Sequence, residues 1–179
     1  MRVMPKITDG ELLLISKARA DKIRSFALGV LLVDRGKSSI ERLCIRVAKD
    51  RFKLAKSKLR DAVQAASCNP ALWRTGVSRA YYAMYHAARS VTYLAHGGDD
   101  HEEHSMLPGK LPPDFPDSDQ WRNKLKMARL NRNKADYDPY PVGDLEFEAT
   151  CQELIQDATI FLRLSQRYIN QKARNSNDS

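Results

Sequence analysis

The sequence predicts an all-α fold, an antiparallel up-and-down helical bundle, from three observations. Apolar residues recur at helical spacing along nearly the whole chain, no stretch alternates as a half-buried β-strand does, and the long helical stretches are joined by mostly short connections. We expect three parts: an N-terminal helical extension over residues 1–37, a bundle with a four-helix core over residues 38–172, and a disordered tail over residues 173–179.

Each predicted helix has its own start and stop signals. The helices are expected at residues 11–34, 39–66, 71–95, 118–137 and 145–171. The stretch DRGKSS ends the first helix, and Ser38 or Ser39 can cap the second. The turn SCNPAL separates the second helix from the third. A long irregular stretch rich in Gly, Pro and Asp precedes the fourth, which Ser118 or Asp119 starts.

The apolar faces of two helices define most of the predicted core. On the 71–95 helix this face comprises Trp73, Val77, Ala80, Tyr81, Met84, Ala87, Ala88 and Val91. On the 39–66 helix it comprises Ile40, Leu43, Cys44, Val47, Leu54, Ala55, Leu59, Val63 and Ala66. The last helix is expected to use Leu145, Leu154, Ala158, Leu162 and Ile169 among others.

The net charge of +8 is concentrated in the first part of the chain. Residues 1–69 hold 16 Lys and Arg against 7 Asp and Glu, a net +9, and the remaining residues hold 14 against 15, a net −1. On the 39–66 helix, Lys49, Lys53 and Lys56 form a lysine stripe that Arg60 continues. Such a stripe is typical of a surface that follows a nucleic-acid backbone, and equally of a solvated helix face.

The sequence favours a cytoplasmic protein. No run of about 18 uncharged apolar residues is present to span a membrane, and acidic residues come too early in the chain for a secretory signal. The three cysteines, Cys44, Cys68 and Cys151, are odd in number and include no CxxC pair. We therefore expect reduced thiols that fill the core.

An arginine occupies the apolar side of the 118–137 helix. On a helical wheel, Arg132 falls in line with Trp121, Leu125, Ala128 and Ala135. A buried guanidinium needs a partner, and Asp136 lies within reach one turn later. Two interpretations are open: a purely structural Arg132–Asp136 pair, or an arginine that lines a phosphate-binding cleft.

Two motifs resemble the HEPN superfamily. The segment SRAYYAMYHAARS, Ser78 to Ser90, and the later RLNRNKADYDPYP, Arg129 to Pro141, are similar to motifs of small stand-alone HEPN proteins, over roughly residues 53–171. The resemblance implies an all-α bundle that is commonly a homodimer. In catalytic members it implies metal-independent RNA cleavage by an arginine, often followed by a polar residue, and a histidine after a gap of four to six residues. Two copies then face each other across the dimer.

This sequence has the arginine of that motif and lacks the histidine. Arg132 and Asn133 match its first positions, and the three gaps lead to Tyr137, Asp138 and Pro139, so Tyr137 takes the histidine's place. Arginine suits the binding of phosphate charge, and histidine suits proton transfer at neutral pH. A tyrosine, with an ordinary pKa near 10, is a poor base and a tolerable acid. Three interpretations stay open: a ribonuclease, a protein that binds RNA or nucleotides without cutting, and a non-catalytic helical interaction or dimerisation module.

A second stripe on the 71–95 helix mixes basic and aromatic side chains. It comprises Arg79, Tyr82, His86, Arg89 and Tyr93. This mixture suits contact with phosphates and bases, and equally a dimer interface. We expect Arg79, Tyr82 and His86 to bind phosphate together with Arg132 and the lysine stripe.

The stretch HGGDDHEEH, His96 to His104, has the composition of a metal site. His101 and His104 could share a ligand face if this stretch were helical. It lacks a recognised ligand pattern, however, and glycines with acids also describe a solvated loop, so we expect no metal and no cofactor. The resemblance suggests another role for His104, since HEPN relatives often carry a histidine after this helix.

The resemblance also implies a context and a partner. Some HEPN toxins are held in check by a nucleotidyltransferase antitoxin, which modifies a tyrosine close to the motif. Tyr140, expected to be exposed near a helix end, is the candidate for such a modification here. A role in a toxin–antitoxin or defence system is therefore one expectation.

Overall fold

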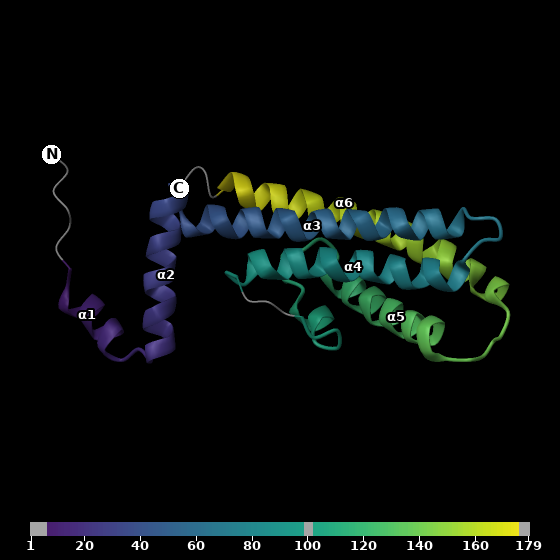
Figure 1. Cartoon of the computed structure of the whole chain (residues 1–179), viewed down its shortest axis with the longest axis horizontal. Coiled ribbons are helices and arrows are strands. Elements are labelled where there is room, and N and C mark those ends of the chain that lie inside the picture. The colour runs from purple at the N-terminus through teal and green to yellow at the C-terminus, as the bar shows by residue number, and fades with distance from the viewer. Residues whose placement is uncertain (1–6, 99–101, 176–179) are drawn as a thin grey trace. The chain divides into compact units, whose positions relative to one another are not determined.

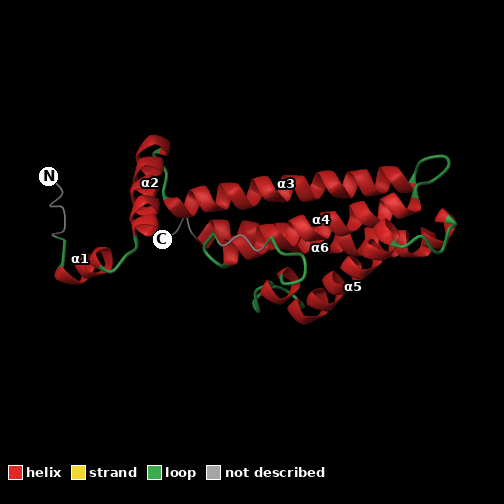
Figure 2. Ribbon diagram, turned by 60° about the horizontal axis from the view of Figure 1, so that its bottom comes forward, coloured by secondary structure: helices red, strands yellow, loops and turns green. Residues whose placement is uncertain are grey.

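The computed structural model describes residues 7–98 and 102–175. Within these ranges the chain forms six α-helices and two short 3₁₀ turns, with no strand (Figure 1, Figure 2). The all-α prediction is confirmed. The chain divides into two compact units, Met1–Ile40 and Glu41–Ser179.

The N-terminal unit contains two helices where the sequence predicts one. They are α1 (Asp9–Ser16) and α2 (Ala20–Gly36). A capping box starts α1: the backbone N–H of Thr8 donates to Glu11 Oε2 at 2.7 Å, and the backbone N–H of Glu11 donates to Thr8 Oγ1 at 3.3 Å. No described residue of either helix is buried. Because helical periodicity is not reinforced here by packing on a core, it does not fix one continuous helix.

The second unit is an up-and-down bundle of four helices. These are α3 (Ile40–Ala66), α4 (Trp73–Ala95), α5 (Ser118–Tyr137) and α6 (Glu148–Asn175), and successive helices run in opposite directions (Figure 1). Helices α3, α4 and α6 lie lengthwise beside one another, and α5 packs on α4 on the side away from α3 (Figure 1, Figure 2). The 3₁₀ turns η1 (Leu107–Lys110) and η2 (Asp144–Phe147) precede α5 and α6.

Helix α4 forms the centre of the core. The face predicted for it is buried apart from Trp73, which is partly buried. All five residues predicted for the apolar side of α5, Arg132 included, are buried. Helices α4 and α6 approach closely at Gly76, where an added Cβ would lie 2.3 Å from Cys151 Sγ. Only glycine fits at that contact without displacing its neighbour.

The predicted core face of α3 is wrong in part. Four of its large side chains are about 40% exposed or more: Ile40, Val47, Leu54 and Val63. The buried residues of α3 are instead Ile45, Ala48, Phe52, Ala55, Ala62 and Ala65. The alanines at 48, 55 and 62 recur every seven residues and let the backbone come close to α4, where Ser90 Oγ donates to the Ala48 carbonyl at 2.5 Å.

Three smaller expectations also change. Helix α6 continues to Asn175 with Ala173 buried, so the first residues of the predicted tail are helical, and residues 176–179 lie outside the described ranges. Leu145 lies in η2 and is 69% exposed. Cys151 is buried as predicted, but Cys68 is exposed.

None of the helices in the described ranges is both long and apolar enough to span a membrane.

Candidate functional site

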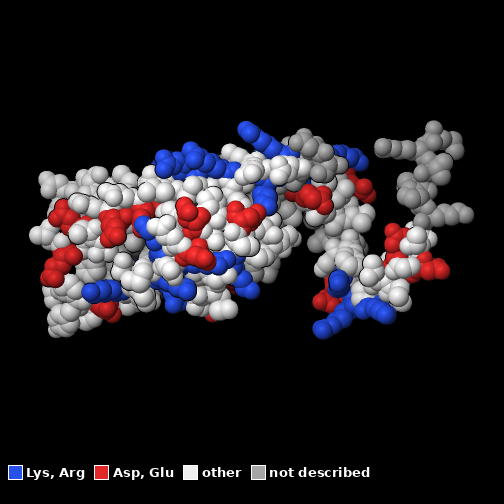
Figure 3. Space-filling view, turned by 180° about the vertical axis from the view of Figure 1, so that it is seen from behind, with Lys and Arg blue, Asp and Glu red and all other residues white. Residues whose placement is uncertain are grey.

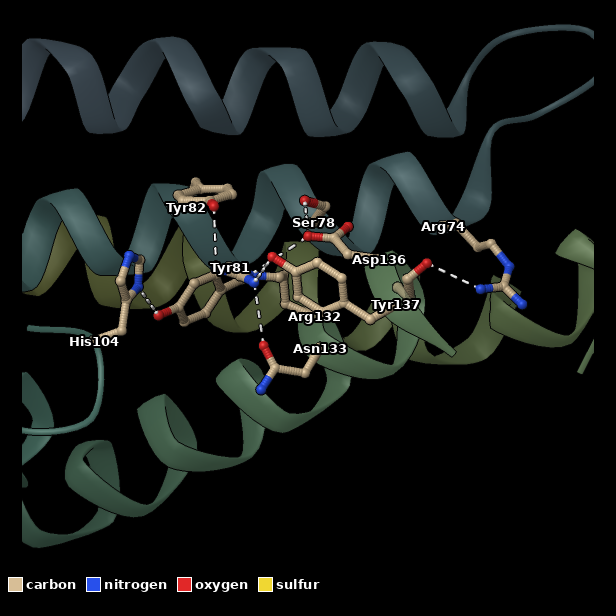
Figure 4. Close-up of polar contacts among 10 residues, drawn as sticks. Arg74, Ser78, Tyr81, Tyr82, His104, Arg132, Asn133, Asp136 and Tyr137 are labelled. Carbon is tan, nitrogen blue, oxygen red and sulfur yellow. Dashed lines mark hydrogen bonds and ion pairs between the residues drawn. The ribbon is translucent and has the colours of Figure 1, made fainter. Parts of the chain in front are cut away.

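The guanidinium of Arg132 lies between α4 and α5 and is nearly enclosed. Arg132 is 7% exposed. Its Nη1 donates to Asn133 Oδ1 at 3.2 Å and to the Tyr137 hydroxyl at 3.1 Å, and its Nη2 donates to the Tyr82 hydroxyl at 3.1 Å (Figure 4). All three hydrogen-bond acceptors are neutral oxygens. The positive charge is therefore solvated by dipoles rather than neutralised by them.

Three tyrosine rings surround the same guanidinium. Arg132 Cζ lies 5.3 Å, 5.2 Å and 5.5 Å from the ring centroids of Tyr81, Tyr82 and Tyr137. We call these three residues the tyrosine cage. A cation close to an aromatic face is attracted by the ring quadrupole, by about 0.5–2 kcal/mol at each ring. The cage thus stabilises a buried charge without supplying a counter-charge.

Asp136 is the carboxylate beside Arg132. The distance from Arg132 Nε to Asp136 Oδ2 is 3.5 Å, yet Nε makes no hydrogen bond within the described residues. The same carboxylate oxygen accepts from Ser78 Oγ at 3.3 Å (Figure 4). The expected ion pair is therefore present, but its geometry is loose compared with a hydrogen-bonded arginine–carboxylate pair.

The chain after Arg132 is held by a second arginine. Arg74 Nη1 donates to the carbonyls of Ala135 and Asp138, both at 2.9 Å, and its Nη2 donates to the Pro141 carbonyl. These contacts satisfy carbonyls at the end of α5, which have no partner within the helix. They also fix the DPYP segment, and so place Tyr137 at the last residue of α5.

The start of α4 is fixed from the same region. The Asp144 carboxylate accepts from the backbone N–H groups of Trp73 at 2.6 Å and Arg74 at 3.0 Å. Asp144 therefore caps the N-terminus of a helix that begins 71 residues earlier in the sequence. Asp144 and Arg74 thus connect the start of α4, the end of α5 and the segment that follows α5.

His104, from the segment after α4, reaches the tyrosine cage. Its Nδ1 and the Tyr81 hydroxyl are 2.5 Å apart (Figure 4). Its ring stacks on Tyr85 with centroids 4.0 Å apart and planes 11° apart. The Tyr85 hydroxyl donates to the Glu102 carbonyl at 2.5 Å, which ties this segment to α4. Burial, and then the positive charge of Arg132, lower the pKa of His104.

His86 packs against Tyr82. The two rings stack with centroids 6.3 Å apart and planes 27° apart. Burial, and then Arg89 and Lys58, lower the pKa of His86 to about 4. His86 is therefore neutral at pH 7. In contrast, burial raises the pKa of Tyr81, which keeps its hydroxyl protonated.

The structure brings together only some of the residues that the sequence analysis groups as phosphate-binding. Arg132, Asn133, Tyr137, Tyr82 and Asp136 form one cluster, with His86 against it. Arg79 is exposed on α4, and the described contacts of Arg132 do not include it.

The lysine stripe lies on the exposed side of α3. Lys53 pairs with Asp50 at 2.6 Å, and Lys56 Nζ lies 5.7 Å from the Phe52 ring. Lys53 and Lys56 also line a groove of about 750 Å³ together with the apolar Leu59 and Val63. The stripe is therefore basic and apolar at once. In the view from behind, Lys and Arg side chains gather in patches, with Asp and Glu side chains between some of them (Figure 3).

Several residues of the cluster lack a signal in the sequence. The apolar pattern of the 71–95 helix predicts only a core position for Tyr81, and no motif in the sequence indicates a role for Arg74 or Asp144. The charges that act on His86 come partly from Lys58 and Arg51 of α3, on a different face from the lysine stripe. One sequence signal could have identified Arg51 and Lys58: they are seven residues apart, which places both on one side of α3.

The metal hypothesis has no support in the part of the chain that is described. No group of three or more His, Cys, Asp or Glu side chains there could hold a metal ion. His104 instead contacts Tyr81 and Tyr85. His101, the other histidine considered, lies outside the described residues.

The segment that holds this cluster matches a known domain. The HEPN domain family matches residues 44–168, which include all residues of the Arg132 cluster and leave out α1 and α2. The chain belongs to the HEPN family. No curated protein matches the chain by sequence. The match confirms the predicted membership in the HEPN superfamily and suggests an RNA-related or nuclease function.

Proposed function

We propose that this HEPN protein binds RNA, or the phosphates of nucleotides, at Arg132. The observation that carries the proposal is a buried guanidinium whose hydrogen bonds within the described residues go to neutral oxygens, and whose ion-pair partner Asp136 is not hydrogen-bonded to it. A phosphate oxygen is a stronger acceptor for arginine than a hydroxyl, because the hydrogen bond is charge-assisted. The site therefore has a cation that gains from an anionic ligand.

We expect Tyr137 to control the access of a phosphate to Arg132. Tyr137 is 71% exposed, although its hydroxyl accepts from Arg132 Nη1. Rotation of this exposed side chain costs little packing, and it would uncover the Nη1 donor. A phosphate oxygen then takes the place of the Tyr137 hydroxyl, while Tyr82 and Asn133 keep the guanidinium in position.

The proposal includes a homodimer. Tyr82, His86 and Arg89 are half-buried along one side of α4, and tyrosine and arginine are enriched in protein interfaces. A symmetric pair would set two Arg132 sites on one cleft, which agrees with the arrangement that the HEPN resemblance implies.

Cleavage is the less supported part of the function. With Tyr137 in the place of the motif histidine, we expect RNA binding with slow metal-independent cleavage, in a toxin–antitoxin or defence role with a nucleotidyltransferase antitoxin as partner. Tyr140, 73% exposed, is accessible for modification by such a partner. The alternative function is a helical interaction or dimerisation module, favoured by the 7% exposure of Arg132 and its ion pair with Asp136.

Binding of a fluorescent single-stranded RNA, measured by anisotropy, tests the proposal. Arg132→Met should weaken binding about tenfold or more, because it removes a charge-assisted contact worth about 1.5–3 kcal/mol. The matched control is Arg163→Met, which removes an exposed arginine of α6 and should leave the affinity within about twofold. Equal affinity of the two variants, with both folded by circular dichroism, would favour the interaction module.

A further inference from the structure

The HEPN motif of this chain lacks a histidine, but the fold supplies one from another segment. His104 and Arg132 contact the same two tyrosines. The Tyr81 hydroxyl lies 2.5 Å from His104 Nδ1, and the centroid of the Tyr81 ring lies 5.3 Å from Arg132 Cζ. Tyr82 accepts from Arg132 Nη2, and its ring meets the His104 ring edge-on with centroids 6.0 Å apart.

We propose that His104 is the catalytic proton-transfer residue of the Arg132 site and acts on the 2′-hydroxyl of RNA whose phosphate Arg132 binds. The inference rests on the proposed function, since it needs RNA at Arg132. It assigns to a loop histidine the task for which Tyr137 is chemically poor.

The ring of His104 is held as a catalytic imidazole needs to be. Tyr85 stacks on one face at 4.0 Å, and the Tyr85–Glu102 hydrogen bond fixes the segment that carries His104. The Tyr81 hydroxyl forms a hydrogen bond with His104 Nδ1. In the tautomer with its proton on Nδ1, that proton is donated to the Tyr81 oxygen, and Nε2 keeps the lone pair that a base requires.

The charges around His104 favour its neutral form. Its pKa is lowered first by burial and then by Arg132, Arg129 and Arg89. Because the ordinary pKa of histidine is about 6.5, a lowered pKa favours the neutral imidazole of His104, which can accept a proton. Among the described residues, the titratable or charged groups that contact His104 or act on its charge include Tyr81, Tyr82, Tyr85, His86 and Arg89 of α4 and Arg129 and Arg132 of α5; Glu102 and Glu103 precede it in its own segment.

The reaction balances without a metal or a co-reactant. His104 Nε2 takes the proton of the 2′-hydroxyl, and the 2′ oxygen forms a bond to phosphorus. The bond from phosphorus to the 5′ oxygen breaks, and that oxygen takes the proton back from the imidazolium. The products are a 2′,3′-cyclic phosphate and a 5′-hydroxyl. Arg132 binds the non-bridging oxygens, where negative charge increases in the transition state.

The test compares His104→Asn with the control His96→Asn, an exposed histidine at the end of α4. Asparagine can keep a hydrogen bond to Tyr81 but does not titrate. We expect slow cleavage of a short RNA to cyclic-phosphate ends by the unmodified protein, with a rate that rises with pH through the pKa of His104 and then levels. His104→Asn should lose about 100-fold or more of this rate and the pH dependence, with RNA affinity within about threefold. His96→Asn should behave as the unmodified protein.

A second measurement does not depend on the variants folding. In the unmodified protein, binding of an oligonucleotide with a 2′-deoxy scissile position should raise the pKa of His104 in an NMR titration, because phosphate favours the imidazolium. RNA that binds but is never cleaved, cleavage that survives His104→Asn, or an unchanged pKa of His104 would overturn the inference while leaving RNA binding in place. Failure of the RNA-binding proposal would be seen in a separate experiment, in which Arg132→Met and the control Arg163→Met would bind RNA with equal affinity.

Discussion

Replacing Arg132 and Asp136 singly and together distinguishes a structural pair from a ligand-binding arginine. The 3.5 Å between Nε and Oδ2 corresponds to a gross attraction of about 5 kcal/mol at an effective dielectric constant of about 20. Desolvation of a guanidinium that is 7% exposed cancels several kcal/mol of this, and Nε makes no hydrogen bond to the carboxylate. We therefore expect a coupling energy of about 1 kcal/mol or less.

The assay is urea unfolding of four proteins at one concentration: the unmodified chain, Arg132→Met, Asp136→Asn and the double variant. Methionine fills the space within the tyrosine cage without a charge, so Arg132→Met should change the free energy of unfolding by less than about 1.5 kcal/mol. A coupling energy above about 2 kcal/mol, with Asp136→Asn restoring stability lost in Arg132→Met, would refute this reasoning. Arg132 would then be a structural residue.

The remaining predictions concern packing, charge, assembly and Tyr137. Gly76→Ala places a Cβ 2.3 Å from Cys151 Sγ and should lower the free energy of unfolding by about 1–3 kcal/mol, and adding Cys151→Ala should recover most of it; a fully stable Gly76→Ala protein would contradict the close packing. Changing the whole lysine stripe to Glu should weaken RNA binding for every sequence and reduce its salt dependence, whereas unchanged binding would show a solvated face. Sedimentation at tens of micromolar should give twice the 20.4 kDa chain mass, and a monomer would exclude the shared cleft. Tyr137→His should cleave RNA about tenfold faster than Tyr137→Phe, since it adds an imidazole beside Arg132; equal rates would show that position 137 takes no part in proton transfer.

The four helices of the bundle and the burial of Arg132 could be predicted from the sequence because both depend on local periodicity. The predicted limits of the 118–137 helix coincide with α5, and its five predicted inward residues are the buried ones. The buried side of α3 could not be predicted in the same way. Large apolar residues and alanines both recur there at helical spacing, and the close approach to α4 selects the alanines.

Helical spacing in the sequence paired Arg132 with Asp136, and the HEPN resemblance added Asn133 and Tyr137; all four lie within two turns of α5. The place of His104 was decided only by the tertiary structure. His104 is 23 residues from Tyr81 in the chain, and Asp144 is 71 residues from Trp73, the first residue of the helix that it caps. Contacts between such distant segments depend on the path of the backbone between them. Local spacing does not encode that path, whereas the packing of α4 against α5 and of the segment after α4 determines it.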